Sequence, residues 1–498
     1  MKTHHYRLLT FINFLFLHTL FYAAPSPSTM FDDHMVLQQE MPVPIWGTAK
    51  KGEKITVSFD GQKKTTITNS DGKWMVTLKP LKASFKGKTL KISGDTDVSF
   101  SDVVVGEVWI CSGQSNMAFP RNLVEELTPL YEKVKNKSSL RTLKIIETAS
   151  LTPMDNAVAK WSTLPSESAV AFSFSYHLQK EINVPVGIIA TNWGGTQIES
   201  WMPKELTKEL PHFKEKMEAF QINDKKKIEA YIKKTEKYPN RGKGLERKQE
   251  VYLRSNPNIL YNAMIHPLIP FAFRGMVWYQ GEGNSKTSLE HERYKKSLPI
   301  WVKKLRENWN RDFCFMAVML PGFGRGMKNV EYPNVFCWAS FREAQENLLT
   351  EPNTFISNSI DLGSINNLHP SDKEPIGQRL SLLARKHIYA QDIEAQGPCY
   401  QKHTIKDDKL IIHFDHAKGL KTKDGSSPKG FWLSGENEQW YMADAKIDGT
   451  TVILNSKEVK NPKACRYAFA AKPTVNLVNS AGLPAYPFRT DDRPLPKK

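Results

Sequence analysis

A serine lies in a cluster of turn-forming residues directly after an apolar run, a placement typical of a catalytic nucleophile. Residues 103–110 are apolar and rich in β-branched side chains, which predicts a strand buried on both faces. The run ends in the small polar segment 112–116, which contains Ser115. A strand that passes through such a turn into a helix presents the hydroxyl beside unpaired backbone N–H groups. Ser115 is therefore the candidate nucleophile. An ordinary turn is the alternative, since Met117 replaces the second glycine of a Gly-x-Ser-x-Gly elbow.

A serine hydroxyl is a weak nucleophile unless a neighbouring base takes its proton. Of the 13 histidines, His369 is the best candidate, because it precedes Pro370 and an apolar pattern of helical period over residues 376–384. A loop histidine just before a helix can reach the end of a neighbouring strand. His266, which also precedes a proline, fits a packed turn residue better.

Two further segments follow predicted strands and carry groups that can stabilise an oxyanion. Gly194 and Gly195 come shortly after the apolar run 186–190, and a glycine lets a backbone N–H approach a ligand closely. Gln280 follows the run 275–279, and its side-chain amide can donate a hydrogen bond. A tetrahedral intermediate needs such donors aimed at its developing charge. From the residues alone, the glycine pair is better interpreted as a tight turn. Gln280 is better interpreted as an ordinary loop residue.

Four segments carry a resemblance to a known family. Residues 106–117 (Gly-Glu-Val-Trp-Ile-Cys-Ser-Gly-Gln-Ser-Asn-Met) resemble the nucleophile block of the sialate O-acetylesterases, carbohydrate acetylesterases of the wider SGNH or GDSL-like hydrolase group. Residues 191–201 and 361–379 are similar to the family's oxyanion and catalytic-histidine blocks. Residues 275–284 resemble its Trp-Tyr-Gln-Gly-Glu-Ser-Asn block, with Gly283 replacing the small polar residue, a change expected to loosen the loop. The resemblance extends from about residue 30 to residue 492.

The resemblance implies the roles of the catalytic residues. Ser115 is the nucleophile and His369 the base. The oxyanion hole consists of the N–H groups of Ser115 and Gly195 and the amide of Gln280. Gly194 is the alternative source of the glycine N–H.

The acidic partner of the histidine departs from the pattern of the wider group. SGNH hydrolases place an aspartate three residues before the histidine, but Asn366 occupies that position here. Either Ser115 and His369 work as a dyad, with a carbonyl or an amide orienting the imidazole, or Asp361 reaches the histidine from the end of its strand. Asp361 is the candidate acid, and both alternatives stay open.

Three residues are candidates for substrate binding, each with a structural alternative. Trp193 can stack on a sugar face or pack in the core. Glu282 can contact substrate or organise the pocket. Arg342, in a segment that resembles a family block, can meet a sugar carboxylate or form a structural salt bridge.

The order of apolar and helical segments predicts an α/β protein with a β module at each end. Apolar runs at 103–111, 186–192, 275–279, 315–320 and 355–361, separated by helical patterns, predict a doubly wound parallel sheet. The resemblance implies that it is SGNH-hydrolase-like, with three α/β/α layers. We predict a signal peptide (1–24), an N-terminal β module (25–100), a catalytic domain (101–396) and a C-terminal β module (397–498). A Lys- and Glu-rich helical insert occupies about residues 203–250 of the catalytic domain.

Charge and leader indicate where such a protein works. The net charge is +17, but the lysines concentrate in residues 204–248 among many glutamates, which indicates solvated helix surface rather than a nucleic-acid groove. Lys2 and Arg7 precede an apolar run at 8–20, which is the pattern of a signal peptide. The protein is therefore predicted to be secreted or periplasmic. No later apolar run is long enough to span a membrane.

The cysteines predict neither a metal site nor a disulfide framework. There are five, and their spacing matches no zinc pattern. Cys399 with Cys465 is the one disulfide considered, and Cys111 is predicted to be a buried hydrophobe rather than a nucleophile. We expect no metal and no organic cofactor.

Together these features predict a secreted serine esterase that removes O-acetyl groups from sugars through an acetyl-serine intermediate. The predicted partner is an O-acetylated carbohydrate, with no nucleic acid and no membrane span, and sialate O-acetylesterase is the activity that the resemblance implies. An acetylxylan esterase is the alternative within the same class. A non-catalytic carbohydrate-binding protein is the alternative from another class, and the presence of both Ser115 and His369 argues against it.

Overall fold

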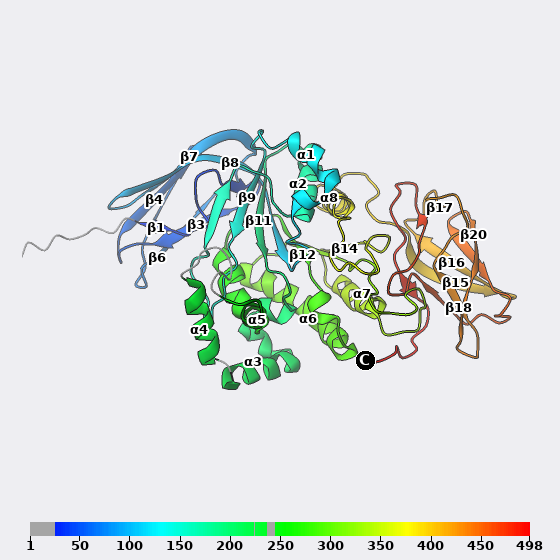
Figure 1. The fold of residues 1–498 in the computed structure, drawn as a ribbon. Helices are drawn as coiled ribbons and strands as arrows, with labels where there is room; N and C mark the ends of the chain where they lie inside the picture. The colour runs from blue at the N-terminus through cyan, green and yellow to red at the C-terminus, as the bar shows by residue number, and fades with distance from the viewer. Residues whose placement is uncertain (1–24, 224, 237–244) are drawn as a thin grey trace, which may run out of the picture.

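The computed structural model describes residues 25–223, 225–236 and 245–498, and Figure 1 shows their arrangement. N-terminal strands (blue), a central sheet with helices, and C-terminal sheets (orange to red) follow one another across the molecule. The predicted signal peptide lies outside the described residues and stays a prediction.

The central sheet places the five predicted strands next to one another. Six strands run parallel in the order β9 (Leu140–Ile145), β11 (Val186–Asn192), β8 (Asp97–Gly113), β12 (Gly275–Tyr279), β13 (Cys314–Val318) and β14 (Thr354–Ser357). The antiparallel strand β10 (Ala159–Ser162) pairs with β9 and makes the sheet mixed. The parallel core was predicted, but β9 and β10 were missed. Their short segments carry Arg, Thr, Lys and Ser side chains and so lack a continuous apolar run.

Strand β8 joins the N-terminal strands to the central sheet. Its first residues alternate between exposed and half-buried and pair antiparallel with β7 (Ser84–Ser93), whereas the residues from Val103 onward are buried. A strand with one solvated face alternates, and a strand covered on both faces is continuously apolar. Because β8 crosses the predicted boundary at residues 100 and 101, one strand serves both parts and one apolar core runs through them.

The remaining N-terminal strands are short, and all but one pair antiparallel, as the Asp-Gly turns predicted; β2 (Val36–Gln38) pairs parallel with β8. Three of them form a separate sheet: β1 (Ser26–Pro27), β3 (Val43–Thr48) and β6 (Lys73–Leu78). The others attach to the large sheet: β2 (Val36–Gln38), β4 (Lys54–Phe59) and β5 (Gln62–Ile67).

Eight α-helices lie among the described residues, and two of them hold the histidine loop. In chain order they are α1 (Thr128–Glu132), α2 (Ala169–Ile182), α3 (Pro211–Asn223), α4 (Lys225–Glu236), α5 (Arg247–Arg254), α6 (Ser288–Trp309), α7 (Trp338–Glu346) and α8 (Glu374–His387). Helix α8 packs on α2, where Ser173 donates to the Glu374 carbonyl at 2.7 Å. Figure 1 shows these two helices together, with α3 to α6 grouped below the central strands.

The C-terminal strands form further antiparallel sheets with a core of their own. One sheet contains β15 (Cys399–Lys406), β16 (Lys409–Asp415), β21 (Thr451–Asn455) and β20 (Asp444–Asp448). Another contains β19 (Trp440–Met442), β18 (Phe431–Ser434), β22 (Ala464–Tyr467) and β24 (Phe488–Arg489), and β17 (Lys421–Thr422) pairs with β23 (Leu477–Val478). Tyr486 donates to the Ile356 carbonyl of β14 at 2.7 Å, so this part is fixed to the central sheet.

The cysteines are all free thiols. The disulfide considered between Cys399 and Cys465 is not formed, because the two residues lie on β15 and β22 of different sheets. Cys111 is buried in β8, and burial raises the pKa of its thiol, which agrees with a structural role. None of the described helices is both long and apolar enough to cross a membrane.

A buried charge joins β8 to its neighbours. The Glu107 carboxylate is fully buried, and the Arg274 guanidinium donates to both of its oxygens at 2.8 Å. Gln38 and Gln39 of the N-terminal strands donate to the same carboxylate at 3.0 and 2.6 Å. Removal of the arginine would leave a buried carboxylate without its counter-charge.

We expect Arg274→Met to lower the free energy of unfolding by about 3–5 kcal/mol, the usual cost of breaking a buried ion pair. Urea unfolding followed by tryptophan fluorescence measures this change. Lys73→Met, which breaks an exposed pair with Asp155, is the matched control and should cost about 1 kcal/mol or less. A loss below about 1 kcal/mol in Arg274→Met would show that Glu107 does not depend on this partner.

Candidate active site

Ser115 lies in the turn after β8, where three strands end side by side. In the ladders, Gly113 at the end of β8 faces Asn192 of β11 on one side and Tyr279 of β12 on the other. The Ser115 side chain is only partly buried, so a substrate can reach its hydroxyl. The sequence places the serine here because the apolar strand ends at Gly113 and the following polar residues turn back over the sheet edge.

His369 reaches this turn from the loop before α8. Its Nε2 lies 2.7 Å from Ser115 Oγ, a hydrogen bond in which the hydroxyl donates when Nε2 is unprotonated. Burial, together with the nearby Lys373 charge, lowers the pKa of His369. A neutral imidazole at this distance can take the serine proton, so the predicted nucleophile and base are brought together.

The predicted acid lies elsewhere. The Asp361 carboxylate accepts from Arg379 at 2.7 and 2.8 Å and from Lys423 at 2.9 Å. These two cations hold the pKa of Asp361 low against the effect of burial. Among the described residues, no carboxylate lies within ion-pair distance of the His369 ring. The structure thus does not bring Asp361 to the histidine, and Asn366, at the position of the SGNH aspartate, is exposed.

The turn after β11 lies against Ser115. A Cβ built on Gly194 would lie 3.2 Å from the Cβ of Ser115, so this backbone approaches the serine as closely as a side chain would allow. Gly195 has a φ of +71°, which favours glycine, and faces the Arg254 guanidinium. Among the described residues, no backbone or side-chain acceptor takes the N–H of Ser115, Gly194 or Gly195.

Gln280 supports this turn from behind. It is fully buried, and its Nε2 donates to the Thr196 carbonyl at 3.1 Å and to Asn284 Oδ1 at 3.0 Å. Both hydrogens of the amide are therefore already used within the protein. The predicted direct bond from Gln280 to the oxyanion is absent from this arrangement, in which the side chain instead fixes the carbonyl next to the glycine pair.

A second buried group connects the serine turn with the histidine loop. Asn116 Nδ2 donates to the Leu368 carbonyl at 3.1 Å and also to Glu282 Oε1. Asn116 Oδ1 accepts from Lys373 at 2.8 Å. Burial raises the pKa of Glu282 and lowers that of Lys373 to about 8. Glu282 thus contacts the residue after Ser115, which is compatible with the predicted role of organising the pocket, and that role stays a prediction.

Two other predicted substrate-binding residues are enclosed. Arg342 is buried and donates to the carbonyls of Leu320, Ala470 and Ala471, which ties the end of β13 to the C-terminal part. Trp193 is buried and donates to Glu250 at 3.1 Å. Trp193 thus has the core-packing alternative that the sequence left open. Arg342 is structural in a way that was not predicted, since among the described residues its partners are backbone carbonyls and not the carboxylate of a salt bridge. The described residues contain no cluster of His, Cys, Asp or Glu that could hold a metal ion.

Comparison with known proteins identifies the family. Residues 105–232 and 247–382 match the family described as "Carbohydrate esterase, sialic acid-specific acetylesterase", which is more than half of the chain and includes Ser115, Gly195, Gln280 and His369. The chain belongs to this carbohydrate esterase family. It is therefore a hydrolase that acts on ester bonds.

Full-length relatives of this acetylesterase family agree. The sialate O-acetylesterase of Rattus norvegicus is 28% identical, with 92% of each chain covered. The Homo sapiens enzyme of the same name is 27% identical over 92% of this chain and 91% of its own. Among solved structures, a carbohydrate acetylesterase from Xanthomonas citri is 29% identical and superposes with a TM-score of 0.80, covering 94% of this chain and 100% of its own.

This acetylesterase departs at one loop position from the family motif that residues 275–284 resemble. Gly283 replaces the small polar residue, and a Cβ there would lie 2.4 Å from the Thr196 carbonyl oxygen. The substitution was expected to loosen the loop. Instead it permits a backbone approach between the two loops behind the serine that no larger residue would allow.

Two residues of this acetylesterase site were missed from the sequence. Asn116 immediately follows the serine, and Lys373 lies four residues after the histidine. The signal that could have identified them was their closeness in sequence to Ser115 and His369. It was a weak one, because a lysine near a helix start usually faces solvent, and nothing local predicts that Lys373 is buried between Phe119 and Tyr279.

The acetylesterase should show an acid limb in its pH profile that depends on Lys373. Because burial and the Lys373 charge lower the pKa of His369, the base stays unprotonated to a lower pH than an exposed histidine would. We expect kcat/KM to fall with acid below the ordinary histidine value of about 6.5. Lys373→Met removes a positive charge that opposes the imidazolium, so its acid limb should move to higher pH.

The measurement is kcat/KM for 4-nitrophenyl acetate from pH 4 to 8. Lys386→Met, which removes the same charge from the far end of α8, is the control and should keep the wild-type limb. An acid limb that stays in place or moves to lower pH in Lys373→Met would contradict the assignment.

Proposed function

We propose that this protein is a serine esterase that removes O-acetyl groups from sugars, with O-acetylated sialic acid as the preferred substrate. The observation that carries the proposal is the 2.7 Å hydrogen bond between Ser115 Oγ and His369 Nε2 beside three available N–H groups. The names of the family and of its relatives supply the substrate class. The catalytic part is proposed to have the three-layer SGNH arrangement around its parallel sheet.

The first half of the reaction forms an acetyl-serine. Ser115 Oγ attacks the acetyl carbonyl carbon while His369 Nε2 takes the hydroxyl proton. The carbonyl oxygen becomes an oxyanion, which accepts from the N–H of Ser115 and that of Gly195 or Gly194. When the bond to the sugar oxygen breaks, the imidazolium gives its proton to that oxygen and the sugar alcohol leaves.

The second half uses water in place of the serine. His369 takes a proton from water as the hydroxide attacks the acetyl-serine, and the same N–H groups hold the second oxyanion. The ester bond to Ser115 then breaks, the imidazolium returns its proton to Ser115 Oγ, and acetic acid leaves and loses its own proton to solvent to become acetate. No charge or group remains on the enzyme, so no cofactor enters the balance.

The pair is proposed to work as a dyad, because Asp361 is engaged with Arg379 and Lys423. An acid would orient the imidazole, and contacts to the backbone of the histidine loop supply part of this orientation. Asn116 donates to the Leu368 carbonyl, and Asn367 Oδ1 accepts from the backbone N–H of His369 at 3.0 Å. Two neighbouring residues of the loop are thereby fixed, which places the histidine over the serine.

The test is acetate release from O-acetylated N-acetylneuraminic acid, acetylated xylan and 4-nitrophenyl acetate by the wild-type enzyme and by Ser115→Ala. We expect the highest kcat/KM on the acetylated sialic acid. We expect Ser115→Ala, shown to be folded by circular dichroism, to lose about 10⁵–10⁶ in turnover on every substrate, as in a serine hydrolase that lost its nucleophile.

The two parts of the proposal fail separately. A kcat/KM at least tenfold higher on acetylated xylan would overturn the sialic acid assignment and leave the esterase mechanism standing. More than about a tenth of wild-type turnover in Ser115→Ala would overturn the nucleophile, since that activity is far above the residue expected after its loss.

A further inference from the structure

An ion pair between a buried glutamate and a partly exposed lysine lies directly after the glycine turn that faces Ser115. Glu199, in the turn Ile198–Trp201, has a side chain only 3% exposed, and Lys216 Nζ of helix α3 donates to its Oε1. Burial alone would raise the pKa of Glu199, but the Lys216 charge, with a hydrogen bond from Asn284, holds it below its usual value. The carboxylate is therefore a buried anion whose counter-charge comes from the Lys- and Glu-rich segment.

The anion is connected to the turn that faces the serine. Asn284 Nδ2 donates to Glu199 Oε2 at 2.9 Å, and Asn284 Oδ1 accepts from Gln280 at 3.0 Å and from the Ile198 N–H at 3.0 Å. Gln280 in turn donates to the Thr196 carbonyl at 3.1 Å. The chain of contacts thus runs from Lys216 through three side chains to the residue after Gly195.

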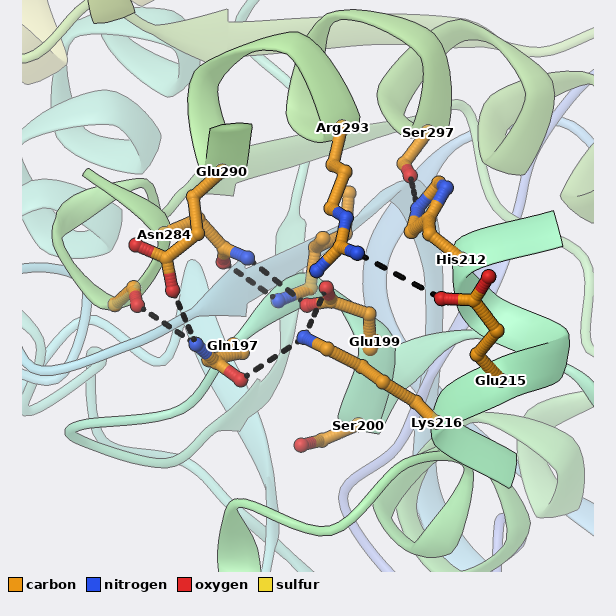
Figure 2. Close-up of polar contacts among 12 residues, drawn as sticks. Gln197, Glu199, Ser200, His212, Glu215, Lys216, Asn284, Glu290, Arg293 and Ser297 are labelled. Carbon is orange, nitrogen blue, oxygen red and sulfur yellow. Dashed lines mark hydrogen bonds and ion pairs between the residues drawn. The ribbon is translucent and has the colours of Figure 1, made fainter. Parts of the chain in front are cut away.

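A second contact runs from the same lysine to the other loop. Lys216 donates to Gln197 Oε1 at 3.3 Å, and Gln197 Nε2 donates to the Gly283 carbonyl at 3.0 Å. Figure 2 shows Lys216 pointing from its helix towards Gln197 and Glu199, with Asn284 on their far side. The neighbouring Arg293 lies 3.7 Å from Glu215 of helix α3, so it pairs with that carboxylate and not with Glu199.

We propose that Lys216 is a positioning residue for catalysis, which holds the Gly194–Thr196 turn in place through its ion pair with the buried Glu199. This gives the Lys- and Glu-rich helical segment a function in the active site rather than only a solvated surface. The inference rests on the proposed function, because the turn matters for the reaction only if its N–H groups meet the oxyanion.

Loss of the lysine should act on the transition state. An unpaired Glu199 would turn towards water or take up a proton. The side chains of Asn284 and Gln280, which are hydrogen-bonded to it in sequence, would then shift as well. The oxyanion develops only during the reaction, so a displaced N–H lowers turnover without weakening substrate binding. Displacements of about 1 Å at a catalytic group can cost about 10²-fold in rate.

The experiment measures kcat and KM for 4-nitrophenyl acetate and for O-acetylated sialic acid. We expect Lys216→Met to lower kcat by about 10- to 100-fold with KM within about twofold of wild type. Lys216→Arg keeps the charge and should retain most of the turnover. The double variant Lys216→Met/Glu199→Gln removes both charges but keeps an acceptor for Asn284, so it should recover most of the loss.

The matched control is Lys214→Met. Lys214 lies on the same helix, is exposed, and is 3.9 Å from the exposed Glu218, so its loss changes the net charge equally without touching the turn. Wild-type kcat is expected. If Lys216→Met does not fold, the double variant carries the test, since it lacks the unpaired buried charge.

Three results would overturn the inference. They are a folded Lys216→Met with wild-type kcat, a rise in KM with unchanged kcat, and a double variant no more active than Lys216→Met. The second would make Lys216 a substrate contact. Ser115→Ala in the same assay separates this failure from that of the proposed function. If Ser115→Ala is inactive, only the role of Lys216 is lost, and if it is active, the mechanism itself is wrong.

Discussion

The hydrogen bond between Ser115 and His369 joins residues 254 positions apart. It depends on the fixed positions of strand β8 and helix α8 relative to each other. The serine comes at the end of β8, which the parallel ladders to β11 and β12 fix on both sides. The histidine comes just before α8, which packs on α2. A reaction that needs a 2.7 Å contact therefore depends on the packing of a strand and a helix that are distant in sequence.

Buried charges recur in the supports of this site. Glu107 with Arg274 joins β8 to the residue before β12, and Glu199 with Lys216 lies behind the glycine turn. Asn116 links Glu282 to Lys373 beside the histidine. A buried ion pair contributes little net stability compared with apolar packing, but breaking one is costly. Such pairs consequently favour one arrangement of the loops over others, which is what a site made of strand ends requires.

The sequence predicted those features that depend on local pattern or on a long motif. The apolar runs of β8, β11, β12, β13 and β14 were long enough to identify, and the motifs around Ser115 and His369 predicted that these two side chains meet, as they do. Strands β9 and β10 were missed because their residues are mixed.

The direction in which a side chain points was not predictable. Gln280 lies where an oxyanion donor could lie, but its amide hydrogens are taken by Thr196 and Asn284, residues that only the tertiary fold brings near. Asp361 was predicted to end a strand, but β14 ends at Ser357 and Asp361 lies in the turn that follows, where Arg379 of α8 and Lys423 pair with its carboxylate. Pairings between distant segments decide both cases.

The central claim is that Ser115 is a nucleophile activated by His369, and covalent labelling tests it most directly. The enzyme is treated with phenylmethylsulfonyl fluoride, and the adduct is located by peptide mass spectrometry. The account predicts a single sulfonyl group on the peptide that contains Ser115, no such group in Ser115→Ala, and much slower labelling in His369→Ala. An inactivated enzyme whose label lies on another residue, with Ser115 unmodified, would contradict it.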